Sequence, residues 1–309
     1  MSVKPLVFGH RGACAYRPEN TLEAFALAYE QGVAAIECDI VPTKDHALVL
    51  RHENALSGTT DVATRPEFAH LKRAGFVDGH AVSDWFTEDF ALAEIRQLRA
   101  IERLPEWRPG SAAFDGQFAV PTLGELLAAP FLNNRSVILE LKHGAYFEGL
   151  GIPVLDLLAA EVEASGWRER GIRLIFESFN LDVLTRARAR LGDIGEFVFL
   201  LDRDHLPGKT RYVSDEFLAA LVGKVHGVSF DLDLLLGQKP AFSNADFGSP
   251  TGLVERAHAL GFRVYTWTAR VEQALYSVEE YFSHFVNTGA DGIFADHPDL
   301  LQNYVAGHA

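Results

Sequence analysis

The sequence predicts a closed α/β barrel with eight parallel strands, the (β/α)8 or TIM barrel. Apolar strand-like runs alternate with helical patterns along most of the chain, which is typical of a parallel sheet. Eight such runs are present, the number that closes a barrel. A length of 309 residues is long for an ordinary domain but normal for one barrel. We therefore expect one domain over residues 1–309.

The elements are expected in a regular order. The first strand precedes a helix over about 21–31, with Asn20 or Thr21 as its N-cap and Gly32 at its end. The second strand leads through a short turn at 43–46 into another apolar run, and this connection is too short for a parallel crossover, so we expect an antiparallel hairpin. The expected barrel strands are 6–10, 36–40, 136–142, 173–178, 197–200, 227–231, 263–268 and 292–296, and the clearest later helices are 154–165, 181–191, 215–222 and 252–260.

Residues 53–120 break this alternation. The segment shows no clear strand, and its one expected helix runs from about Glu88 to Ala100 with Thr87 as its cap. A connection of this length inside a compact domain is usually functional. We therefore expect a small insertion over the mouth of the barrel, with a decorative loop as the alternative.

Polar residues gather at the carboxyl ends of the expected strands, where barrel enzymes carry their active sites. A doubly wound open sheet is the alternative fold, but no glycine-rich phosphate-binding fingerprint follows the first strand. The polar residues at or near strand ends are His10, Glu37, Asp39, Glu140, Lys142, Glu177, Ser178, Trp267 and Asp296.

Three carboxylates predict a metal site. Glu37 and Asp39 point to the same face of their strand, roughly 6 to 7 Å apart. The residues around them are apolar, so the charges are costly to bury without a cation, unless they are solvated on an edge strand. With Glu140 they form an all-oxygen ligand set, which favours Mg²⁺, Ca²⁺ or Mn²⁺. We expect one divalent cation.

Two histidines and two cations complete the predicted site. His10 and His52 are possible metal ligands, but we interpret them as proton-transfer groups because imidazole titrates near neutral pH. Arg11 and Lys142 lie beside them or beside the carboxylates. This combination suits chemistry at a phosphoryl group. The metal and the cations would hold the phosphate oxygens, and the imidazoles would exchange protons with the nucleophile and the leaving group.

Composition excludes several kinds of partner. A net charge of -14 argues against nucleic acid and against an anionic membrane surface. Two cysteines, Cys14 and Cys38, cannot form a disulfide framework. No signal peptide or long apolar run is visible, so we expect no stable membrane insertion and a cytoplasmic protein. The oligomeric state does not follow from the sequence.

Several motifs in order closely resemble the glycerophosphodiester phosphodiesterase family. The resemblance covers nearly the whole chain, and its first block of four motifs is specific. The motifs are Gly9-His10-Arg11-Gly12, Pro18-Glu19-Asn20-Thr21, Glu37-Cys38-Asp39 and His52, followed by Glu140-Leu141-Lys142, Ser178-Phe179, Trp267-Thr268 and the closing run at 292–299.

This resemblance implies a metal-dependent barrel enzyme that cleaves glycerophosphodiesters to sn-glycerol 3-phosphate and an alcohol. In the family's usual mechanism the glycerol 2-hydroxyl attacks phosphorus, and water then opens the resulting cyclic phosphate. The implied roles are metal binding by Glu37, Asp39 and Glu140, acid and base catalysis by His10 and His52, phosphate contact by Arg11 and Lys142, support near the glycerol by Glu19, and an apolar wall formed by Phe179 and Trp267.

Departures from the family pattern leave alternatives open. Glu53 stands where many relatives have Asp, Glu177 replaces a small or neutral residue, and Arg270 stands where Asn or Asp is frequent. Trp267 has the alternative interpretation of a plain core residue, and Asp296 that of a helix cap. Asp296 is left outside the predicted catalytic set. The alternatives are a phospholipase D-like enzyme acting on lysophospholipids or sphingolipids, and an inactive barrel that binds a phosphodiester. The preferred alcohol and the native metal stay open.

Overall fold

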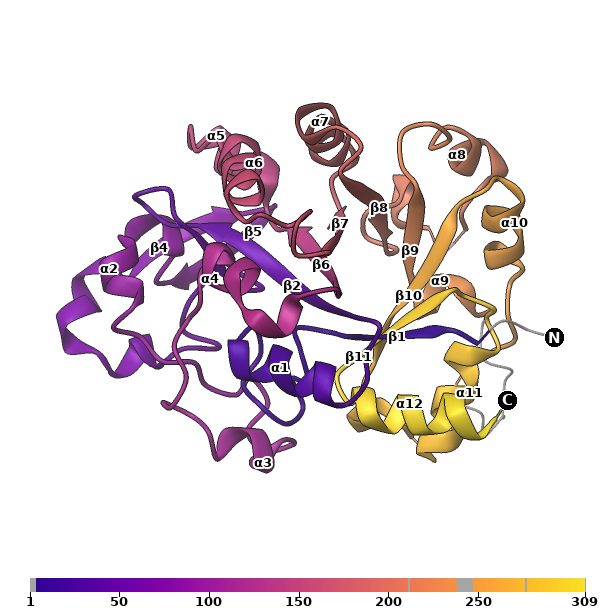
Figure 1. Cartoon of the computed structure of the whole chain (residues 1–309), viewed down its shortest axis with the longest axis horizontal. Coiled ribbons are helices and arrows are strands. Elements are labelled where there is room, and N and C mark those ends of the chain that lie inside the picture. Colours follow the sequence, from indigo (N-terminus) through magenta and orange to yellow (C-terminus); the bar gives the residue numbers. More distant parts are fainter. Residues whose placement is uncertain (1–3, 211, 238–246, 276, 309) are drawn as a thin grey trace.

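The computed structural model describes residues 4–210, 212–237, 247–275 and 277–308 and forms the predicted barrel (Figure 1). Neighbouring strands pair in parallel, and pairing of the first two strands, with Gly9 opposite Ile36, closes the sheet. The (β/α)8 prediction is therefore confirmed. In spatial order the barrel strands are β1 (Leu6–Gly9), β11 (Gly292–Ala295), β10 (Arg263–Ala269), β9 (Gly227–Asp231), β8 (Gly195–Leu201), β7 (Arg173–Ser178), β6 (Ser136–Leu141) and β2 (Ala35–Pro42).

Helices follow most of these strands and cover the outside of the barrel. The first helix, α1 (Leu22–Glu30), begins at the predicted cap, where the Thr21 hydroxyl accepts the N–H of Ala24 at 3.2 Å. The other principal helices are α4 (Leu123–Ala128), α5 (Gly144–Gly149), α6 (Val154–Ala164), α7 (Leu181–Leu191), α8 (Asp215–Ala219), α9 (Leu232–Leu235), α10 (Leu253–Ala259), α11 (Val278–Val286) and α12 (Pro298–Gly307). No helix within the described ranges is both long and apolar enough to cross a bilayer.

The alternation of side chains along the strands positions the site. Ile36, Cys38 and Ile40 of β2 join the large core between the sheet and the helices. The opposite face points into the barrel, where a small apolar cluster fills the interior as a packed layer. On most of these strands, the inward-facing residue two positions further along is polar. The apolar layer therefore lies directly beneath the polar residues at the carboxyl ends of the strands. The interior cluster is Phe8, Ala35, Ile138, Ile175, Val198, Tyr265 and Phe294.

The predicted antiparallel hairpin is confirmed. Strand β3 (Leu48–Leu50) pairs with the end of β2, with Ile40 opposite Leu50. The backbone N–H of Arg51 then donates to the carbonyl of Asp39 at 3.0 Å. The hairpin thus brings the residues after β3 to the carboxyl end of β2.

Our expectation that residues 53–120 contain no strand was wrong. Strands β4 (Arg73–Val77) and β5 (His80–Asp84) form an antiparallel hairpin. Its two-residue turn is Asp78-Gly79, and both residues have positive φ, 45° and 87°. Asp-Gly is a strong signal for such a turn, and the sequence carried it.

The predicted helix from Glu88 to Ala100 was also wrong. The segment contains a short 3₁₀ helix, η3 (Thr87–Asp89), and one turn of helix, α2 (Leu92–Ile95). Between them Phe90 is buried against Phe68, with ring centroids 5.1 Å apart, and Ala91 is extended. Tertiary packing overrides helix propensity here. The segment's other short helices are η1 (Asp61–Thr64), η2 (Pro66–Leu71) and α3 (Pro109–Ala112), and the whole segment gathers at one side of the barrel (left in Figure 1).

Candidate active site

Most of the predicted site residues line one cavity at the carboxyl ends of the strands. The space between its lining atoms, including open solvent at its mouth, is about 530 Å³. Asp39 and Glu19 are buried beside it and are not among the described residues that line it. The predicted residues on its walls are His10, Arg11, Glu37, His52, Glu140, Lys142, Phe179 and Trp267, and Glu177 and Arg270 also line it.

Three glutamates from neighbouring strands converge in this cavity. Glu37, Glu140 and Glu177 each offer an oxygen within 4.8 Å of the others, and all three are buried. Burial raises the pKa of Glu140 to about 7 and the pKa values of Glu37 and Glu177 well above the usual range, and the neighbouring carboxylates add to the shifts of Glu37 and Glu177. Among the described residues, Glu37 Oε1 and Glu177 Oε2 find no hydrogen-bond donor. A divalent cation fits this donor set, because its charge would relieve both the repulsion and the missing contacts.

Asp39 has different surroundings from the three glutamates. Its Oδ2 accepts a hydrogen bond from Asn20 at 2.9 Å and lies 3.4 Å from Arg11 Nε, while Oδ1 lies 3.3 Å from Lys142 Nζ. Burial opposes ionisation, but Lys142, His52 and Arg11 hold the pKa of Asp39 well below its usual value. Asp39 is therefore an ionised carboxylate that organises the cations beside the glutamate cluster.

His10 is held by a carboxylate from the last strand. Its Nδ1 lies 2.6 Å from Asp296 Oδ1. The other oxygen of Asp296 accepts from Arg108 at 2.5 Å and from Arg270 Nε at 3.1 Å. Burial and the nearby Arg11 lower the pKa of His10 to about 4, although Asp296 opposes this shift. His10 is therefore neutral at pH 7 when the cavity holds no anion.

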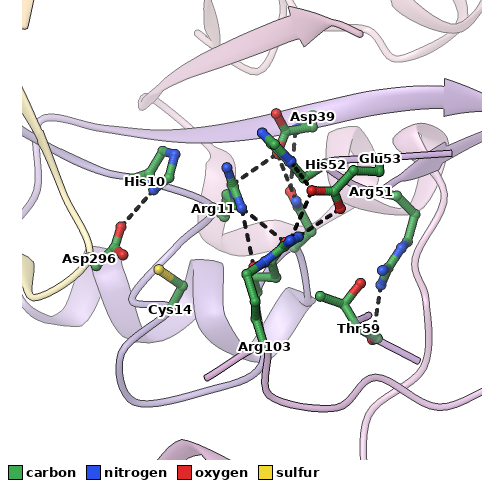
Figure 2. A network of polar contacts seen from close by, with 12 residues as sticks. His10, Arg11, Cys14, Asp39, Arg51, His52, Glu53, Thr59, Arg103 and Asp296 are labelled. Atoms are coloured by element: carbon green, nitrogen blue, oxygen red, sulfur yellow. Dashed lines mark hydrogen bonds and ion pairs between the residues drawn. The ribbon is translucent and has the colours of Figure 1, made fainter. Parts of the chain in front are cut away.

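His52 has a similar partner within its own loop. Its Nδ1 lies 2.5 Å from Glu53 Oε1. Arg103 donates to both oxygens of Glu53, at 2.8 and 2.7 Å (Figure 2). Burial, together with Arg11 and Lys142, lowers the pKa of His52 well below its usual value. Both histidines thus bind a carboxylate through Nδ1, which leaves Nε2 for proton transfer.

Arg11, in the loop after β1, is held through both its backbone N–H and its charged side chain. The N–H of Arg11 donates to Glu37 Oε2 at 2.8 Å, and its side chain donates to Glu19 at 3.2 Å. Gly12 has φ +85°, and a Cβ there would meet the Ala24 carbonyl carbon at 2.5 Å. Only glycine fits this position, so the Gly-His-Arg-Gly motif is a requirement of the turn as well as of the chemistry.

Two aromatic side chains also line the cavity. The rings of Phe179 and Trp267 meet edge to face, with centroids 5.5 Å apart. Lys142 Nζ lies 5.5 Å from the Phe179 ring centre and 2.7 Å from Glu140 Oε1. The aromatic rings and the charged groups thus line the same cavity in close proximity.

Comparison with known proteins identifies the family. The family model for glycerophosphoryl diester phosphodiesterases matches residues 10–300. The chain belongs to this family. It is 28% identical to glycerophosphodiester phosphodiesterase GDPD6 of Arabidopsis thaliana, over 97% of this chain and 86% of the relative. The family is one of hydrolases, so the chain is an enzyme of that class.

One solved structure supports the same assignment, and a second shares the fold. A candidate glycerophosphoryl diester phosphodiesterase of Silicibacter pomeroyi is 25% identical, with a TM-score of 0.72, over 98% of this chain and 93% of that one. A phosphodiesterase of Oleispira antarctica, solved with the product sn-glycerol 3-phosphate, is 22% identical with a TM-score of 0.65, over 98% and 97% of the two chains. The latter likeness concerns the fold.

The structure shows where the residues that depart from the glycerophosphoryl diester phosphodiesterase family pattern lie. Glu53 binds His52, and Glu177 joins the glutamate cluster. Arg270 lines the cavity and binds Asp296. Asp296, which the sequence places at a strand end and which we left outside the predicted catalytic set, contacts His10 from its position directly after β11.

A second cluster of possible metal ligands is already occupied by an arginine. His10, Cys14 and Asp296 each bring a ligand atom within 4.8 Å of the others. The guanidinium of Arg108 lies against this group, with Nη1 3.6 Å from Cys14 Sγ and Nη2 2.5 Å from Asp296. The cationic position beside His10 therefore belongs to Arg108.

Proposed function

We propose that this chain hydrolyses glycerophosphodiesters to sn-glycerol 3-phosphate and an alcohol, with one divalent cation. The observation that carries the proposal is that one cavity contains two histidines, each held through Nδ1 by a carboxylate, together with three converging glutamates. Family membership supports the same reaction.

The proposed metal ligands are Glu37, Asp39 and Glu140, as the resemblance implies, and Glu177 adds a fourth carboxylate. Glu37, Glu140 and Glu177 converge most closely, while Asp39 also balances Lys142 and Arg11. An oxygen-only set favours Mg²⁺ or Ca²⁺. Such an ion would supply positive charge to stabilise phosphate oxygens in the transition state.

Arg11 and Lys142 are the proposed phosphate-binding cations. Both line the cavity, and both are anchored to buried carboxylates that fix their positions. A diester anion beside His10 and His52 raises the pKa of each imidazole, because an opposite charge favours the protonated form. One imidazole then accepts the proton of the glycerol 2-hydroxyl as it attacks phosphorus, and the other donates a proton to the leaving alcohol. Water opens the resulting cyclic phosphate with the two proton transfers reversed, which restores both imidazoles.

Phe179 and Trp267 are the proposed apolar wall, and Glu19 is a proposed support of the phosphate-binding side. Glu19 is bound by Arg11 and by Arg103. It is buried beside the cavity, so its proposed action on the glycerol end of the substrate passes through Arg11.

The test is release of glycerol 3-phosphate from glycerophosphocholine and from glycerophosphoethanolamine, with Mg²⁺, with Ca²⁺ and with a chelator. We expect release with an ion and none with the chelator. No release by folded protein with any ion would overturn the proposal, and activity on lysophospholipids alone would indicate the phospholipase D-like alternative. Binding of the diester without turnover would indicate an inactive barrel.

A further inference from the structure

Two arginines of the 53–120 segment reach the two histidines' carboxylate partners. Arg103 and Arg108 lie five residues apart in the loop that leads into α3. Arg103 donates to both oxygens of Glu53, and Arg108 donates to Asp296. Figure 2 shows Arg103 extending from its loop toward Arg11, Glu53 and His52.

The contacts form two separate chains of the same kind. In one, Glu53 contacts His52 through Oε1, while Arg103 bridges Oε1 and Oε2. In the other, Asp296 contacts His10 through Oδ1, while Oδ2 accepts from Arg108. A guanidinium that binds a carboxylate fixes its orientation as well as its charge. A carboxylate fixed in this way sets the tautomer and the ring angle of the histidine that it binds.

The loop that carries these arginines is itself held in place. The N–H of Glu102 donates to Asp115 at 2.7 Å, and the Glu102 carboxylate accepts the N–H of Leu104 at 2.9 Å. Arg103 binds both oxygens of Glu19 at 2.8 Å. Arg108 also donates to Glu272 Oε1 at 2.5 Å, which ties the loop to the segment after β10. Each arginine therefore has a second anchor besides its histidine's carboxylate.

We propose that Arg103 and Arg108 are positioning residues, through which residues 53–120 hold both histidines of the active site in their working orientation. Arg103 acts through Glu53 on His52, and Arg108 acts through Asp296 on His10. This inference rests on the proposed function. It assigns to the segment a role in catalysis that requires no contact of its own with the substrate.

The first test compares Arg103→Met and Arg108→Met with Arg73→Met. Arg73 is a matched control, because it belongs to the same segment and pairs with Glu88 at 3.0 Å and Asp89 at 2.5 Å, and among the described residues neither carboxylate contacts a histidine. For glycerophosphocholine we expect kcat to fall about 10- to 100-fold in the first two variants, with a smaller change in KM. Arg73→Met should keep the wild-type kcat.

Double-mutant cycles distinguish positioning from general support of the fold. Arg103→Met should cost much less kcat in a Glu53→Gln background than in the wild type, with a remainder that passes through its contact with Glu19. Arg108→Met should cost little further kcat in an Asp296→Asn background, because each pair acts as a unit. The crossed pairs should be close to additive. Additive losses within both chains, or wild-type kcat in both arginine variants, would overturn the inference.

Nitrogen NMR of the histidine rings separates this inference from the proposed reaction. The ¹⁵N shifts of a ring report its tautomer, so Arg103→Met should change the signals of His52 and leave those of His10, with the reverse for Arg108→Met. This readout is independent of turnover. An absence of hydrolysis by the wild type would therefore contradict the proposed reaction and still leave the positioning role measurable. If Arg108→Met does not fold, Arg108→Lys keeps the buried charge without the fork, and the same selective change is expected.

Discussion

The two histidines reach the same cavity by different structural routes. His10 and Asp296 follow β1 and β11, which pair in parallel with Gly9 opposite Ala295, so the barrel itself brings them together. His52 and Glu53 are neighbours in a loop after β3. The side chain of Asp296 is 3% exposed and that of Glu53 is 32% exposed. Strand register thus brings His10 to its carboxylate partner, whereas His52 meets its partner within one loop, and in both cases an arginine from residues 53–120 binds that carboxylate.

Loss of either imidazole should have the largest effect. We expect His10→Ala and His52→Ala each to lower kcat about 10²- to 10⁴-fold, because general acid and base catalysis contributes that much. Neither change should unfold the protein, since the barrel core does not include these side chains. Steady-state release of glycerol 3-phosphate, with circular dichroism as the folding control, checks both variants. Activity within tenfold of wild type in either one would contradict its assigned role.

Neutralising Asp296 and Glu53, the carboxylate partners of the two histidines, should affect stability to different degrees. Asp296→Asn removes one of the two carboxylates that the buried Arg108 binds, the other being Glu272, and should lower the free energy of unfolding by about 3 kcal/mol as well as kcat. Glu53→Gln should lower kcat with a much smaller change in stability, because Glu53 and Arg103 are partly exposed. Urea unfolding and kinetics on the same samples measure both quantities. Equal losses of stability would show that the two routes do not differ as described.

The glutamate cluster should lose cation affinity when Glu177 is neutralised. Glu177→Gln keeps the shape of the side chain and removes one charge from the cluster, so we expect affinity for Mn²⁺ to fall about 10-fold. Glu196→Gln is the control, because Glu196 lines a cavity at the amino ends of the strands. Electron paramagnetic resonance during a Mn²⁺ titration measures free ion directly. Unchanged affinity in Glu177→Gln would place the ion away from this residue.

Cation binding should stabilise the fold more strongly as pH rises. Burial raises the pKa of Glu140 from 4.5 to about 7. The folded state therefore holds this proton more tightly than the unfolded state does. The contribution of Glu140 to the free energy of unfolding is fully present below about pH 4.5, where the group is protonated in the folded and the unfolded state, and it is lost as pH rises through about 7. A cation takes the place of the proton, so the increase in Tm caused by Mg²⁺ should grow between about pH 5 and about pH 8. Differential scanning calorimetry with Mg²⁺ and with a chelator measures this difference, and an increase that does not vary with pH would contradict it.

The sequence predicted the barrel because strand and helix periodicity are local properties. Nearly every predicted strand and helix outside residues 53–120 is present. The sequence also indicated the cavity lining, because carboxyl strand ends converge in any such barrel. It could not indicate the contact between His10 and Asp296, which joins residues 286 positions apart through strand register.

Residues 53–120 were the hardest to predict for a physical reason. Phe90 interrupts the expected helix because it packs against Phe68, a contact that depends on how the whole segment folds. Arg103 and Arg108 resemble surface arginines in the sequence, since their partners come from distant parts of the chain. Glu177 differs, because its position at the end of β7 and its departure from the family pattern were both visible.

The most direct test of the account is kcat for glycerophosphocholine in the double variant His10→Ala/His52→Ala, compared with the two single variants. If both imidazoles act on one bound diester, each single change removes most of the catalysis and the double variant is little worse than either, because residues that act as a unit are strongly non-additive. If the two losses multiply, or if one single variant retains wild-type turnover, the two histidines do not serve a common reaction step and the account is wrong.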